Sequence, residues 1–400
     1  MNKRFLPQVL TIGFAVFSMF FGAGNLIFSV NLGRMFQSQT PLALVGFLLT
    51  GVCLPVLGIF SITLFGGNCR AWFARAGKRT GTVLYVAILL IIGPLIPMPR
   101  IVALAHTMLT AYLPHSMTLP LFATLFLTIT LACAIAEKQV IEVLGKWISP
   151  LLLLCLAILV AFALVTPAVV HPSALPATHV LHKNLIYGYN TTDFITSIYF
   201  GSIIMAILRK NARTKAQNTQ VHHLCLAGSG FGLFLLGLVY VGLATTGARL
   251  ANPDDLLDAG QVLASVSRLA LGHWGGLLMG VIATLACLST LIALAVLLAD
   301  HLTRHALGGK VKYRTCLLAT LITTGLMANL GLSSIIQLSA PLLNFVHPTI
   351  IALSIINILY KKIGFQPAQS IIWICLVLSA WYQWESLLEL AQSIQSLFTP

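Results

Sequence analysis

The chain has few charged residues, and very few of these are acids. Only 8% of its 400 residues are charged and nine are Asp or Glu, while 58% are hydrophobic and the mean hydropathy is +0.95. A soluble domain usually carries about a quarter charged residues, so this chain could not cover itself with a water-compatible surface. We therefore expect an all-α polytopic membrane protein.

Other absences exclude classes of function. The sequence has no P-loop and no soluble nucleotide domain, which excludes an ATP-driven pump. It has no paired acids within its apolar runs to hold a metal diphosphate, so we predict neither an enzyme nor an organic cofactor. The eight cysteines form no CxxC and are predicted to be packing residues. The net charge of +14 lies in short clusters rather than on a continuous basic face, which argues against a nucleic-acid partner.

Apolar runs set the architecture, because about 20 apolar residues cross a bilayer core of about 30 Å. Ten such spans are predicted near residues 8–36, 41–66, 82–112, 119–136, 147–170, 190–208, 223–248, 274–299, 315–331 and 333–360. An eleventh run, 370–384, is short and fits either a span or an interfacial helix. No loop is long enough to fold alone, so residues 1–400 are predicted to form a single domain.

Basic residues alternate between the loops and predict the orientation. The loops on one side hold Arg70, Arg75, Lys78, Arg79, Lys138, Lys146, Arg209, Lys210, Arg213, Lys215, Arg304, Lys310, Lys312, Arg314, Lys361 and Lys362. The loops on the other side hold only Arg34, Lys183, Arg249 and Arg268. By the positive-inside rule, the N-terminus is predicted to be cytoplasmic. This alternation requires 333–360 to be one span despite Pro341 and Pro348.

The first span contains two glycines and an asparagine at mid-membrane, in Gly22-Ala23-Gly24-Asn25. A break here would free backbone groups, which lipid tolerates only where they line a protein cavity. The half-helix that follows would point its positive end at a carboxylate, and the carbonyls that end the preceding half-helix suit a small cation. Secondary transporters use discontinuous helices in this way. The alternative is a helix-packing face of small residues.

Five stretches spread over the chain carry a resemblance to a known family. They are Phe21–Phe28 (FGAGNLIF), Gly93–Arg100 (GPL and PR), Gly188–Gly201 (GYNTTD and FG), Leu285–Thr290 (LACLST) and Gln337–Pro341 (QLSAP). Together they resemble the bacterial branched-chain amino-acid:cation symporters (LIVCS family, BrnQ type). The resemblance implies the leucine-transporter fold, with two inverted five-helix repeats (about 8–170 and 190–360), discontinuous helices 1 and 6, and an extra C-terminal helix at about 370–384. The family is usually drawn with twelve spans, whereas this chain has about eleven.

The resemblance also implies site residues. The substrate site would comprise Phe20, Gly22, Ala23, Gly24, Asn25, Tyr199, Phe200 and Gly201, with the break of span six at Phe200-Gly201. The Na⁺ site would comprise the backbones of Ser18 and Phe21 with Ala286, Ser289 and Thr290, all offering neutral oxygens. A second cation could use Asn25 and the carboxylate of the substrate. From the residues alone, Ser289 and Thr290 could equally bond their own i−4 carbonyls.

Two ionisable residues, Arg100 and Asp193, fall inside predicted spans and in the same half of the membrane. An intramembrane charge is costly and is usually paired or functional. We expect them to form or share an extracellular-side gate, and the alternative is a static structural pair. The related fold carries a gating arginine on span one, where this chain has Phe28.

These patterns predict a carrier of the bacterial inner membrane. It would take up Leu, Ile or Val with Na⁺ as the coupling ion (H⁺ is possible) by alternating access. A channel would not need a broken-helix substrate site. The alternatives are a cation-coupled carrier of another small neutral amino acid and, in a different class, a membrane-embedded enzyme. Its expected partners are the amino acid and the lipid bilayer.

Overall fold

The computed structural model describes residues 5–110, 113–114, 116–136, 139–167, 170–173, 175–211, 215–250, 259–306, 309–386 and 388. Within these residues the regular elements are all helices, which confirms the predicted fold class. A helix lies at each of the eleven predicted positions. Seven helical stretches of the described chain are long and apolar enough to cross a membrane.

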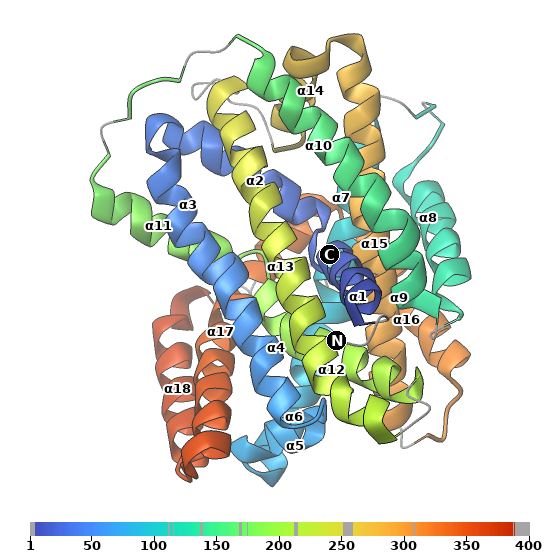
Figure 1. Ribbon diagram of the computed structural model, residues 1–400, viewed down its shortest axis with the longest axis vertical. Coiled ribbons are helices and arrows are strands. Elements are labelled where there is room, and N and C mark those ends of the chain that lie inside the picture. Colours follow the sequence, from blue (N-terminus) through green and yellow to red (C-terminus); the bar gives the residue numbers. More distant parts are fainter. Residues whose placement is uncertain are drawn as a thin grey trace.

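The helices follow one another along the chain and are shown in Figure 1. They are α1 (Phe5–Phe20), α2 (Ala23–Phe36), α3 (Thr40–Leu48), α4 (Leu54–Leu64), α5 (Cys69–Phe73), α6 (Lys78–Leu90), α7 (Pro97–Leu109), α8 (Leu119–Ala134), α9 (Val140–Val143), α10 (Ser149–Val165), α11 (Ala177–Tyr189), α12 (Asp193–Asn211), α13 (Lys215–Leu250), α14 (Ala259–Leu271), α15 (His273–His301), α16 (Tyr313–Ala328), α17 (Leu332–Ile363) and α18 (Ala368–Tyr382). Short π-helical segments join three pairs: η2 (Leu49–Cys53) between α3 and α4, η4 (Ile91–Leu95) between α6 and α7, and η7 (Leu144–Ile148) between α9 and α10.

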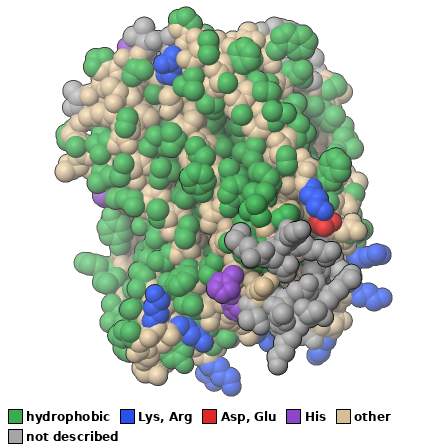
Figure 2. All heavy atoms as spheres, viewed as in Figure 1, with side chains coloured by type: hydrophobic (Ala, Val, Ile, Leu, Met, Phe, Trp, Pro, Cys, Tyr) green, Lys and Arg blue, Asp and Glu red, His purple; other side chains and the backbone are tan. Residues whose placement is uncertain are grey.

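The outer surface is apolar over much of its area. Large side chains such as Leu154, Phe234 and Trp373 are at least half exposed, as expected where lipid rather than water is the solvent. Figure 2 shows hydrophobic side chains over the middle of the visible face, with most of the visible Lys and Arg side chains in its lower part.

The loops gather at two ends in the groups that the charge pattern predicts. At one end, Arg75 after α4 donates a hydrogen bond to the carbonyl of Phe365 after α17 (3.1 Å). At the other end, Gln39 donates to Leu175 (2.8 Å), and Arg249 donates to the carbonyl of Thr166 (3.1 Å). Loops predicted to share a side of the membrane therefore lie together.

The predicted break in the first helix is confirmed. The chain leaves α1 after Phe20, and α2 starts at Ala23. Gly22 between them is extended (φ −99°, ψ 176°), and its carbonyl accepts the first hydrogen bonds of α2, from the N–H groups of Asn25 and Leu26.

The second break is not where the sequence predicted it. The helix α12 continues through Phe200-Gly201, so the predicted break there is wrong. Gly201 instead packs against α4, where an added Cβ would lie 2.7 Å from Ile62 Cγ2. It is therefore a small residue at a helix–helix contact. The sixth helix is interrupted earlier, between Tyr189 at the end of α11 and Asp193 at the start of α12.

Each broken helix packs on an unbroken helix from the opposite half of the chain. The long α13 lies along α1 and α2, while α3 and α4 lie along α11 and α12. The contacts are very close: an added Cβ on Gly33 would lie 1.8 Å from the carbonyl oxygen of Ala244. In Figure 1, α13 runs through the centre of the view beside α4. This reciprocal packing fits the inverted repeat and holds the two breaks close to each other.

The C-terminal helices agree with the predicted spans. α17 is one helix that passes through Pro341 and Pro348, as the charge pattern required. α18 has 15 residues and packs along α17. All eight cysteines are free, as predicted. Residues 389–400 lie outside the described part of the chain.

Candidate substrate and cation site

The two breaks open onto one cavity in the interior of the bundle. It is lined by residues of α1 and α2 at the first break, of α7 and α15, and of the second break with the start of α12. They are Met19, Phe20, Gly22, Gly24, Asn25, Pro97, Arg100, Ile101, Leu104, Thr191, Thr192, Asp193, Thr196, Phe200, Thr290 and Leu294. Its walls combine apolar side chains with a few polar groups, the usual composition of a small-molecule site.

Gly22 in the first break and Gly24 in the first turn of α2 give other side chains close access to the backbone. An added Cβ on Gly24 would lie 2.7 Å from Nη2 of Arg100, and one on Gly22 would lie 3.2 Å from Oγ1 of Thr290. Neither glycine has a positive φ, so proximity rather than backbone conformation requires them. Ala23 begins α2 between these two contacts.

Asp193 is held by two neutral donors from other helices. The Asn25 amide donates to its Oδ2 (2.7 Å), and so does the Tyr240 hydroxyl of α13 (3.0 Å). Asn25 also contacts the Tyr240 hydroxyl (2.5 Å), which closes a triangle of buried groups. Asp193 starts α12, where the positive end of the helix dipole stabilises its charge. Sequence analysis missed Tyr240, because nothing local distinguishes one tyrosine in an apolar run.

Arg100 comes from α7 and faces the first break. Its guanidinium lies over the Phe28 ring, 5.6 Å from the ring centre. The arginine of span three thus sits beside the position where the related fold has its own. Arg100 and Asp193 share the cavity but form no ion pair within 4 Å of each other. Their predicted gating role stays a prediction.

Several residues of the predicted Na⁺ site lie together between α1 and α15. Because α1 ends at Phe20, the carbonyl of Ser18 is left outside the regular helix ladder, and Thr290 Oγ1 lies 3.5 Å from it. The Ser289 hydroxyl donates to the carbonyl of Ala286 (3.1 Å) in its own helix. Thr290 therefore reaches across to α1, whereas Ser289 follows the local alternative.

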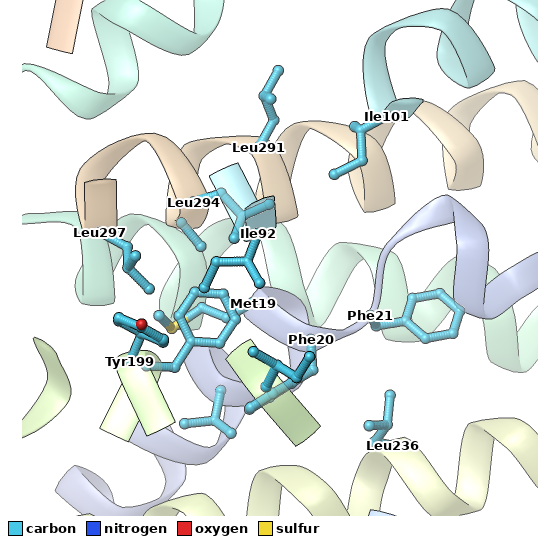
Figure 3. Packing of buried hydrophobic residues seen from close by; sticks show 14 of the residues in the cluster. Met19, Phe20, Phe21, Ile92, Ile101, Tyr199, Leu236, Leu291, Leu294 and Leu297 are labelled. Carbon is cyan, nitrogen blue, oxygen red and sulfur yellow. The ribbon is translucent and has the colours of Figure 1, made fainter. Parts of the chain in front are cut away.

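The remaining predicted residues around α1 are turned in different directions. The Ser18 hydroxyl donates to Ala15 (3.1 Å), which leaves its carbonyl, not its side chain, for the gap. The Phe21 N–H closes the last turn of α1 on Phe17 (2.8 Å). The Phe21 ring points away from Phe20 and is fully buried (Figure 3).

Only part of the predicted aromatic pocket lines the cavity. Phe20 and Phe200 meet edge to face, with ring centroids 5.1 Å apart, and form an apolar wall. Tyr199 and Gly201 lie outside the lining. Tyr199 points toward Tyr85, donating a hydrogen bond to its carbonyl (3.1 Å) with the rings stacked 6.0 Å apart.

A buried polar and aromatic layer continues from Tyr199 toward the end of the molecule that holds α5. The Tyr85 hydroxyl is hydrogen-bonded to Nδ1 of His301 (2.7 Å), and the rings of Phe73 and Tyr199 pack beside them. This layer could not be predicted from the sequence, because its residues come from four separate helices. Because Tyr199 is next to Phe200 of the cavity wall, the layer adjoins the cavity on the side that is predicted to be cytoplasmic.

Broken helices around a central cavity define a class of protein, the secondary transporters. The fold agrees: a structure titled as the nucleobase-cation-symport-1 family transporter Mhp1 matches with a TM-score of 0.61 at 14% identity, covering 96% of this chain and 93% of that one. A variant of the Eremococcus coleocola manganese transporter matches with a TM-score of 0.61 at 15% identity, covering 100% of this chain and 90% of that one. The protein has the leucine-transporter fold of these carriers.

The sequence places the chain within that class. The family model described as "Branched-chain amino acid transport protein" matches residues 6–399, and the chain belongs to this family. It is 32% identical over 378 residues to the branched-chain amino acid permease BraB of Bacillus subtilis, covering 90% of this chain and 83% of the relative. It is 29% identical over 363 residues to the branched-chain amino acid transport system 2 carrier protein of Pseudomonas aeruginosa, covering 88% and 82%. The protein is thus a membrane transporter and not an enzyme.

Proposed function

We propose that this protein takes up leucine, isoleucine or valine, coupled to Na⁺, by alternating access. The observation that carries the proposal is the convergence of two helix breaks on one cavity with oxygen ligands at its edge. The names of the relatives supply the cargo, and the apolar wall of Phe20 and Phe200 suits an aliphatic side chain.

The coupling ion is proposed from oxygen chemistry. The Ser18 carbonyl and the Thr290 hydroxyl lie 3.5 Å apart. Ca²⁺, a hard cation, binds oxygens at about 2.3–2.6 Å, so two oxygens at this spacing can bind one cation of that size. Na⁺ is of similar radius and prefers the same neutral oxygens. Ala286, Ser289 and the Phe21 carbonyl are proposed to complete this shell, and Asn25 to link it to the substrate.

Alternating access is proposed from the buried aromatic layer that adjoins one side of the cavity. The layer of Tyr85, Tyr199 and His301 blocks the path toward α5, so release on that side requires α12 to move. The breaks are natural hinges because few backbone hydrogen bonds cross them. Together with Arg100 and Asp193 as the opposite gate, this arrangement opens the cavity to one side at a time.

The orientation and membrane are part of the proposal. Following the positive-inside rule, the end that holds Arg75 and Lys361 faces the cytoplasm, and so does the N-terminus. The relatives named above come from bacteria, so we place the protein in the bacterial cytoplasmic membrane. The limits of the two repeats, about 8–170 and 190–360, stay a prediction.

Uptake of labelled leucine by proteoliposomes tests the function. An inward Na⁺ gradient is expected to drive accumulation, which unlabelled isoleucine and valine should reduce. Accumulation driven equally well by a proton gradient without Na⁺ would replace Na⁺ by H⁺. No uptake of any aliphatic amino acid under either gradient would refute the proposal.

Replacement of Thr290 by valine tests the cation site within the same assay. Thr290→Val keeps the shape and removes one oxygen, so the Na⁺ concentration for half-maximal uptake should rise roughly tenfold or more, as for a lost hydrogen-bonding group at a charge. Thr284→Val is the matched control, because the Thr284 hydroxyl donates to the carbonyl of Gly280 in its own helix (2.7 Å). Equal Na⁺ dependence of the two variants would remove Thr290 from the cation shell.

A further inference from the structure

The cavity contains one positive and one negative side chain that do not neutralise each other directly. Arg100 has no hydrogen bond or ion pair from its guanidinium within the described part of the chain, only the Phe28 ring. A charge at this depth is costly unless an opposite charge reaches it. Among the described residues, no anionic side chain pairs with the guanidinium, so an anion from a ligand could do so.

The Asp193 carboxylate has hydrogen-bond donors but no cationic partner within 4 Å among the described residues. Both hydrogen bonds that it receives, from Asn25 and from Tyr240, go to Oδ2. Both donors are neutral, so they orient the carboxylate without cancelling its charge. Oδ1 is engaged by neither donor, and the residue lines the cavity while only 4% exposed.

The two charges flank consecutive residues of α2. Arg100 lies against Gly24, and Asp193 is hydrogen-bonded to Asn25. The charges are thus near neighbours, separated by more than a direct ion pair. An α-amino acid carries its carboxylate and its ammonium on the same carbon, so its two opposite charges are also near neighbours.

Two of the helix ends around the cavity have the same polarity as these side chains. The positive N-terminus of α2 lies on the Arg100 side, beside Gly24, and favours an anion there. The C-terminal carbonyls of α11 precede the second break on the Asp193 side and favour a cation. Backbone and side chain thus both favour an anion on the Arg100 side. On the Asp193 side the positive N-terminus of α12 opposes the α11 carbonyls, so the Asp193 carboxylate itself supplies the negative charge.

From this geometry we infer that Arg100 binds the α-carboxylate and Asp193 the α-ammonium of the transported amino acid. The aliphatic side chain then points to the apolar wall of Phe20 and Phe200. The inference rests on the proposed function and sharpens it: the substrate must be a zwitterion, and the bound substrate itself links α7 to α12. Arg100 and Asp193 were predicted to share a gate, and in this arrangement the bound substrate connects the two side chains and so closes it.

Binding by the purified full-length protein tests the assignment with three ligands of almost the same shape. These are leucine, leucinamide (which keeps the ammonium and lacks the carboxylate charge) and 2-hydroxy-4-methylpentanoate (which keeps the carboxylate and lacks the ammonium). Arg100→Gln should weaken leucine roughly 30-fold or more and leave leucinamide nearly unchanged, since it loses a buried charge partner that only leucine uses. Asp193→Asn should weaken leucine similarly and leave the hydroxy acid nearly unchanged.

Two exposed charges supply matched controls, Arg268→Gln and Glu142→Gln, which should change none of the affinities. Tyr240→Phe is a second variant for the anionic side: it removes one donor but keeps the Asp193 charge, so the preference for leucine over the hydroxy acid should persist. If Arg100→Gln and Asp193→Asn weaken all three ligands by one common factor, the assignment is wrong. If Asp193→Asn changes only the Na⁺ requirement, Asp193 is a cation ligand instead. Failure of the wild-type protein to bind leucine would instead refute the proposed function.

Discussion

The two helix breaks face the same cavity but are built from different residues. The first contains Gly22 and is followed by Gly24 in the first turn of α2, and their missing side chains admit Thr290 and Arg100 to the backbone. The second contains no glycine and has Thr191 and Thr192 before Asp193. Thr192 takes a positive φ of 66°, which is unfavourable for a β-branched residue. At the first break, the absence of side chains lets other residues approach the backbone. At the second break, Thr191 and Thr192 supply polar groups, and the backbone at Thr192 is strained.

The largest expected effect concerns Gly22 and Gly24, which contact the cation side and the substrate side of the cavity respectively. Gly22→Ala should raise the Na⁺ concentration for half-maximal uptake, and Gly24→Ala should raise the KM for leucine, each by roughly tenfold, because an added methyl in a tight contact costs about 1–3 kcal/mol. Uptake at varied Na⁺ and leucine concentrations measures both. Gly230→Ala is the control, since an added Cβ there meets nothing within 4 Å. Identical effects of Gly22→Ala and Gly24→Ala would contradict separate roles.

An intermediate effect is expected at the inner end of α12, the helix that follows the second break. Burial raises the pKa of the Cys69 thiol to about 12, and a hydrogen bond with Ser202 of α12 only partly opposes this. Cys69 should therefore be inert to maleimide while α12 is in place, and react several-fold faster when the carrier opens inward. Labelling of a chain that keeps only this cysteine, with and without Na⁺, measures the change.

Cys225 on α13 is the control for that measurement, because it is equally buried but lies on the helix packed against the first break. Its labelling should not depend on Na⁺. Equal rates for Cys69 in all conditions would mean that α12 does not move.

The smallest expected effect concerns strain at the second break. Thr192→Gly should raise Tm by about 1–2 °C, because relief of a left-handed β-branched residue recovers about 1–3 kcal/mol, less about 0.5–1 kcal/mol for the added freedom of glycine. Thr191→Gly should instead lower Tm, since the Thr191 hydroxyl accepts from the Asp193 N–H (3.4 Å). A thermal-shift assay in detergent separates the two. A lower Tm for Thr192→Gly would show that its conformation is not strained.

The same difference explains what the sequence could predict. Glycines in an apolar run are visible locally, so the first break, the fold class and the grouping of the loops followed from composition and charge. The second break was misplaced because Asn190, Thr191 and Thr192 were taken as the start of a span. Such residues typically precede the first turn of a helix, and this pattern could have located the break.

The rest of the site depends on contacts between distant segments. Asp193 meets Tyr240, and Tyr85 meets His301, only after helices from different parts of the chain have packed together. A pattern of spacing along one helix carries no information about such pairs. For the same reason Gly201 was assigned to a break, although its neighbour is Ile62 of α4.

The reciprocal packing also has a consequence for biosynthesis. The helices α1 and α2 reach the membrane first, but α13, on which they pack, ends about 200 residues later in the chain, a delay of roughly 10–40 s at 5–20 residues per second. During that time the Ser18 carbonyl, which the break leaves outside the helix ladder, lacks its final neighbour Thr290 of α15. The insertion machinery must therefore shelter this first broken helix from lipid until most of the chain has been made.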